Sequence, residues 1–122
     1  MEYLTPNFTK EMMKDYTVLV PNMCETSFKL IKSAMESEGY HRVELLGSGS
    51  SNVTQLGLKY VHNDTCYPAL IVIGQFLEAI ESGKYDLNHT ALLISQSGGG
   101  CRASNYIKLL RKALVRSGHS NI

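Results

Sequence analysis

Short apolar runs alternate with longer amphipathic stretches along the chain. Three runs are rich in β-branched and other large apolar residues and end at loops, which predicts buried strands over 16–20, 42–46 and 91–95. Three stretches carry apolar residues every three or four positions, which predicts helices over 25–40, 52–61 and 102–117. The polar residues 1–15 precede the first strand and are expected to form an arm or a short helix.

Residues 66–83 allow two interpretations. The run Ile71–Ile73 has the composition of a strand, but apolar residues continue to Ile80 without a turn, which favours a helix. Asn63 or Asp64 is expected to cap this helix, and the proline near its start is tolerated in a first turn. The helix would be apolar on nearly every side, so we expect it to be buried or to lie at an interface.

The order of these elements predicts an α/β domain. Strands that alternate with helices form a parallel sheet with right-handed crossovers, so residues 16–122 are expected to fold as one three-layer, Rossmann-like or flavodoxin-like domain. A length of 122 residues leaves little room for a second core. Three strands are few for such a fold, so the sequence predicts an incomplete piece of a larger protein.

Composition and charge exclude several classes of function. Hydrophobic residues make up 43% of the chain and charged residues 19%, which is typical of a globular protein. The formal net charge of +1 gives no basic field for nucleic acid or an anionic membrane. The longest apolar run, 69–73, is far too short to span a bilayer, and the first residues carry no secretory signal. The sequence therefore predicts a cytoplasmic protein.

Three cysteines are the main candidates for chemistry. Cys24 follows the first predicted strand, Cys101 follows the third, and Cys66 stands at the start of the predicted helix 66–83. Ligands of open parallel sheets bind at the carboxyl ends of the strands, and helix N-termini there favour the thiolate. Thiolates bind iron or zinc or act as nucleophiles. The alternative is that free cysteines fill core space, which is their more common role.

The glycines that precede Cys101 give a second candidate feature. Three consecutive glycines weaken any regular element, so Gly98–Gly100 are explained best by a backbone that approaches a ligand closely. The small residues of 95–100 also suit a phosphate cradle before a helix. They lack the lysine and serine or threonine of a P-loop and the spacing of a dinucleotide motif. Nucleotide or acyl-CoA binding is therefore a weaker alternative.

Two segments carry a family resemblance. Residues 63–69 (NDTCYPA) and above all 95–106 (SQSGGGCRASNY) resemble blocks of proteins related to the 2-hydroxyacyl-CoA dehydratases and their ATP-dependent activators. Residues 8–12 and 20–23 fit the same family. The resemblance implies an α/β domain in which three cysteines from separate loops hold a 4Fe–4S cluster. Cys66 and Cys101 match the family blocks as metal ligands, and Cys24 is the natural third.

The resemblance also suggests roles for residues around Cys101. The backbone at Gly99 and Gly100 would approach the cofactor, and Asn105 would donate a hydrogen bond to the cluster or the substrate. Arg102 would offset the negative charge of a thiolate-bound cluster, although a solvated arginine is an equal alternative. Tyr106 is a second candidate for such a hydrogen-bond donor, but it lies on the apolar stripe of its helix, which favours a place in the core.

Two hypotheses from different classes follow. The first is an iron–sulfur domain of a dehydratase or activase-related protein, with the rest of that protein or an ATP-dependent activator as partner and an acyl-CoA as substrate. The second is a docking or structural domain without a cofactor. It is favoured by the apolar helix 66–83, through which copies of the chain could associate.

Overall fold

The computed structural model describes residues 6–47, 50–62 and 65–122. The elements follow in the order η1 (Met12–Lys14), β1 (Thr17–Val20), α1 (Glu25–Ser37), β2 (Arg42–Leu45), α2 (Ser51–Tyr60), α3 (Tyr67–Glu81), η2 (Leu87–His89), β3 (Thr90–Leu92), η3 (Arg102–Asn105) and α4 (Tyr106–Arg116), in which η marks a 3-10 helix. The described part of the N-terminal segment thus contains one short 3-10 turn. Strand and helix alternate as the sequence predicts.

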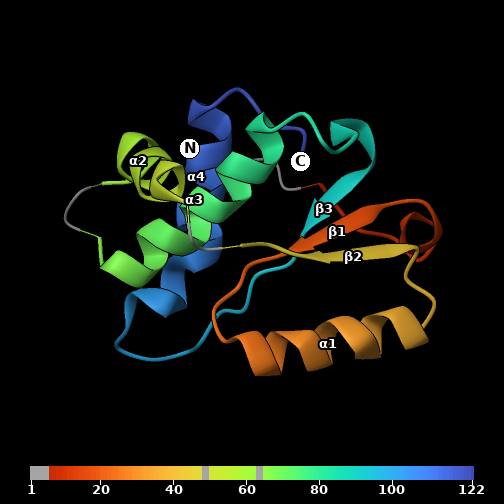
Figure 1. Ribbon diagram of the computed structural model, residues 1–122. Helices are drawn as coiled ribbons and strands as arrows, with labels where there is room; N and C mark the ends of the chain where they lie inside the picture. Colours follow the sequence, from red (N-terminus) through yellow and green to blue (C-terminus); the bar gives the residue numbers. More distant parts are fainter. Residues whose placement is uncertain (1–5, 48–49, 63–64) are drawn as a thin grey trace.

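The three strands form a parallel sheet in the order β2-β1-β3. Val18 of the central strand lies opposite Val43 on one side and Ala91 on the other. Helix α1 covers one face of the sheet, whereas α2, α3 and α4 gather on the other side (Figure 1). The predicted α/β architecture with a parallel sheet is confirmed.

Alternation along β1 divides the core in two, because successive strand residues point to opposite faces. Val18 and Val20 pack with Phe28 and Met35 of α1. Leu19 faces the other way and belongs to the larger cluster around α3 and α4.

Helix α3 is the centre of that larger cluster. Ten of its fifteen residues are buried: Ala69, Leu70, Val72, Ile73, Gly74, Gln75, Phe76, Leu77, Ala79 and Ile80. The prediction of a helix rather than a strand is confirmed, and its apolar residues pack inside this chain. No helix in the described part of the chain is long and apolar enough to cross a membrane.

Helices α2 and α3 approach each other through two glycines. A Cβ atom at Gly57 would collide with the backbone carbonyl of Leu70, and one at Gly74 would collide with the backbone carbonyl of Val53. Both obstacles are backbone atoms, which cannot move aside as a flexible side chain can. The two helices can therefore pack this closely only where both residues lack a side chain.

Several helix boundaries differ from the sequence-based expectations. The helix expected over 25–40 ends at Ser37, and Gly39 follows with φ of 97°. The N-cap of α3 is Cys66, and not Asn63 or Asp64, which lie outside the described residues. The helix expected over 102–117 begins with the 3-10 turn η3, in which Ser104 donates through both its N–H and its hydroxyl to the carbonyl of Cys101.

Replacing Gly74 by alanine is expected to destabilise the fold by about 2–3 kcal/mol, because the new methyl group forces α2 and α3 apart. Gly98→Ala is the matched control, since a Cβ there meets nothing within 4 Å. Urea unfolding of both variants measures the difference. Equal free energies of unfolding would contradict the close contact.

Candidate functional site

All three cysteines are N-cap residues of helices. Cys24 precedes α1, Cys66 precedes α3 and Cys101 precedes η3. Cys24 and Cys101 are exposed and Cys66 is half-buried. The alternative that these cysteines fill core space is therefore wrong. At Cys24, the N–H groups of the first turn of α1 favour the thiolate form, because they carry partial positive charge.

Two of the cysteines lie within electrostatic range of Tyr106. This tyrosine is the first residue of α4 and is only 4% exposed, as expected for a core residue. Burial raises the pKa of the Tyr106 phenol, and the negative charges of the Cys66 and Cys101 thiolates and a hydrogen bond with Cys66 raise this pKa further. Both thiols thus lie near enough to affect the charge of this phenol. The sequence analysis weighed Tyr106 as a donor to the cluster but favoured a place in the core, which its burial confirms.

Cys24 does not belong to this pair. Hydrogen bonds from the Ser27 side chain, then from the backbone of Ser27 and Thr26, lower the pKa of the Cys24 thiol. These donors lie in the first turn of α1, which Cys24 caps. The neighbouring Met23 is 41% exposed, so this part of the loop does not pack beneath the surface.

Buried Gln75 of α3 fixes the loop after β1. Its side-chain Oε1 accepts from the N–H of Asn22 at 2.7 Å, and its Nε2 donates to the carbonyl of Asn22 at 3.3 Å. Gln75 is only 1% exposed, so this pair of bonds satisfies a buried amide and the backbone at once. The sequence analysis did not identify this residue, although a lone glutamine within an apolar helix was the available signal.

Two further contacts order the loop after β3. The Ser95 hydroxyl contacts the sulfur of Met23 at 3.6 Å, which places the loops after β1 and β3 beside each other. The Gln96 side chain accepts from the N–H of Ile107 at 3.1 Å. Gln96 thus satisfies a free donor in the first turn of α4 and explains why the α-helix begins where it does.

The glycine loop is open to solvent. A Cβ at Gly98, Gly99 or Gly100 would meet nothing within 4 Å, and none of the three has a positive φ. Neither packing nor backbone conformation therefore requires these glycines. Asn105 is half-buried and is the N-cap of α4, without a side-chain capping bond. Arg102 is the first residue of η3.

The described residues fit a 4Fe–4S cluster in ligand type but not in number. Thiolates are the ligands that iron–sulfur clusters take, usually four. Within residues 6–47, 50–62 and 65–122, no group of three or more histidine, cysteine, aspartate or glutamate side chains is arranged to hold a metal ion. Cys66 and Cys101 both act electrostatically on the Tyr106 phenol, whereas Cys24 is not among the groups that do. Comparison with known proteins found no matching family model, no matching curated protein and no matching solved structure.

Replacing Gln75 by leucine is expected to destabilise the protein by about 1–3 kcal/mol, because the N–H and carbonyl of Asn22 lose their partners. Hydrogen exchange at the Asn22 amide should quicken in parallel. Gln55→Leu, on the exposed side of α2, is the matched control for the same chemical change. An unchanged exchange rate at Asn22 would show that Gln75 does not hold the loop.

Alkylation of Cys24 by iodoacetamide is expected to persist to lower pH than that of an ordinary thiol, because a lowered pKa keeps more thiolate at neutral pH. The rate is measured against pH in a Cys66→Ser/Cys101→Ser background. Ser27→Ala removes the largest stabilising bond and should move the midpoint of the curve to higher pH. A midpoint that stays in place would exclude Ser27 as the cause.

Proposed function

We propose that this protein presents the thiolates of Cys66 and Cys101 as ligands of an iron–sulfur cluster, in a domain related to the 2-hydroxyacyl-CoA dehydratases and their activators. The observation that carries the proposal is that two cysteines far apart in sequence both lie within electrostatic range of the same buried phenol, Tyr106. Both cysteines belong to the sequence blocks on which the resemblance depends.

The position of each thiol supports this chemistry. Cys66 stands at the start of a fifteen-residue helix and is half-buried. Cys101 caps η3 and is exposed, so an inorganic group can reach it. The open loop Gly98–Gly100 beside Cys101 leaves space for a bulky cofactor, since side chains there would meet nothing. Iron prefers the soft thiolate ligands that this arrangement offers.

The remaining ligands must come from elsewhere. Cys24 is the first candidate, because its loop lies beside the loop that follows β3 and its thiol forms a thiolate readily. A second chain is the other source. The resemblance also implies two partners, and we include both in the proposal. An ATP-dependent activator would donate electrons, and an acyl-CoA would be the substrate.

The apolar character of α3 no longer favours the alternative of a docking domain without a cofactor. That alternative depended on a helix too apolar for an exposed surface, and the apolar residues of α3 are buried within this chain.

Anaerobic reconstitution with iron and sulfide tests the proposal. We expect about four irons per cluster and a broad visible absorption in the wild type. Both should be lost in Cys66→Ser and in Cys101→Ser. The Cys24→Ser variant then shows whether Cys24 supplies a third ligand.

The matched control is Ser95→Ala. It removes a hydroxyl from the loop that leads to Cys101 and leaves all three cysteines in place. It should keep the absorption of the wild type. A folded wild-type protein without iron or colour would contradict the proposal, as would equal iron in the wild type and in a Cys66→Ser/Cys101→Ser double variant.

A further inference from the structure

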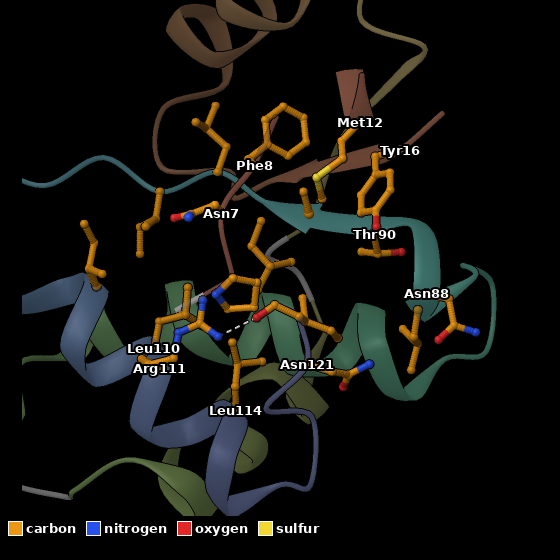
Figure 2. Close-up of a pocket in the computed structure, with 18 residues that line it drawn as sticks. Asn7, Phe8, Met12, Tyr16, Asn88, Thr90, Leu110, Arg111, Leu114 and Asn121 are labelled. Carbon is orange, nitrogen blue, oxygen red and sulfur yellow. Dashed lines mark hydrogen bonds between the residues drawn. The ribbon is translucent and has the colours of Figure 1, made fainter. Parts of the chain in front are cut away.

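A pocket of about 380 Å³ lies between the N-terminal segment, β3 and α4. Residues 6–8 form one wall, and Leu110, Arg111 and Leu114 of α4 lie across from them (Figure 2). Residues 90–94, which begin with β3, complete the lining, and none of the three described cysteines belongs to it. Small-molecule sites in proteins have volumes on the order of 300–1,000 Å³, so this pocket is large enough to be one.

The walls of this pocket are mainly apolar. Leu92 and Ile94 contribute alkyl side chains from the sheet side, and Leu110 contributes another from α4. Two apolar side chains of the lining are open to water, since Phe8 is 43% exposed and Ile107 is 45% exposed. A molecule with an apolar body would cover this surface, and removing the surface from water favours binding.

The polar groups in the walls already have partners within the chain. The guanidinium of Arg111, the one charged side chain among the described lining residues, donates to the main-chain oxygen of Ile122. The hydroxyl of Thr90 donates to the carbonyl of Asp86 at 2.6 Å. In the described part of the chain, no buried side-chain nitrogen or oxygen lacks a hydrogen-bond partner. Because an ionic ligand would find only a charge that the chain already engages, these walls favour an uncharged ligand.

Three asparagines supply polar groups at the mouth of the pocket. Asn7, Asn88 and Asn121 belong to its lining and are exposed. A carboxamide carries no charge and both donates and accepts hydrogen bonds, so it pairs with a hydroxyl, a carbonyl or an amide of a ligand. An apolar lining with a few polar groups that fix orientation is the usual composition of a small-molecule site.

We propose that this pocket binds a small uncharged molecule with an apolar body and one hydroxyl, carbonyl or amide group at its end. The apolar body packs against Leu92, Ile94 and Leu110, and Ile107 covers it at the mouth. The polar end pairs with the carboxamides of the asparagines there. The site shares no residue with the cysteines and does not depend on the proposed iron–sulfur function.

The N-terminal segment argues against an added β-strand as the occupant. In the described residues β3 pairs only with β1, and residues 6–8 lie along its other side, where a further strand would have to pair. Phe8 is held there by aromatic contacts, because its ring stacks on Tyr40 at a centroid distance of 6.3 Å and meets Tyr16 edge-on at 6.2 Å. The pocket is therefore bounded on both sides of β3, which suits a small molecule.

Nile red tests the proposal by fluorescence titration of the full chain, because this dye is an uncharged ring compound with a carbonyl at one end. We expect saturable binding with increased emission, and changes in the NMR chemical shifts of the Leu92 and Ile94 amides. Ile107→Trp fills the mouth from an exposed position and should weaken binding about tenfold or more. The anionic dye anilinonaphthalene sulfonate should bind the wild type at least about tenfold more weakly than Nile red does.

Val115→Trp is the matched control, because Val115 is 38% exposed on the same helix and is not among the described residues that line the pocket. It should bind Nile red as the wild type does. Absence of saturable binding would overturn the proposal, as would equal binding by Ile107→Trp or equal binding of the anionic dye. Binding only after removal of residues 1–5 would identify that segment as the occupant, and a dimer that Ile107→Trp dissociates would identify a second copy. Either result would overturn the proposal too.

Discussion

The close contact of α2 and α3 at Gly57 and Gly74 is the constraint on which the rest of the structure depends. At both positions the backbone of one helix occupies the space where a side chain of the other would be. Helix α3 is thereby held at the centre of the larger core, where ten of its residues are buried. The sheet and α4 pack on the remaining sides of α3 (Figure 1). The fold therefore depends on two residues that contribute no side chain.

The position of α3 also determines the geometry of the candidate site. Its N-terminus carries Cys66, which reaches Tyr106 at the start of α4. Within the same helix, the Gln75 amide holds the backbone of Asn22 in the loop before Cys24. One rigid helix thus fixes the place of one thiol directly and restrains the loop that carries another. A metal site built from separate loops needs such support, because loops alone do not hold ligands at bonding distance.

The sequence predicted the architecture well because periodicity is a local property. The strands around Val18, Val43 and Ala91 and the helix beginning at Tyr67 all follow from apolar spacing. The sequence did not reveal why Gly57 and Gly74 are glycines, because that reason lies on a different helix. It placed Cys24 and Cys101 after strands and Cys66 at the start of a helix, but it did not reveal that Cys66 and Cys101 both act on the Tyr106 phenol. Contacts between distant elements leave no periodic signal along the chain.

Helix α4 borders both the candidate cysteine site and the pocket beside β3. Its first residue, Tyr106, lies within electrostatic range of two thiols, and the next residue, Ile107, lines the pocket. Adjacent residues of one helix point in directions about 100° apart, so these two side chains can serve different sites while sharing one backbone. The N–H of Ile107 is held by Gln96 in the loop before Cys101. One hydrogen bond from the start of α4 therefore helps to position the loop that precedes Cys101.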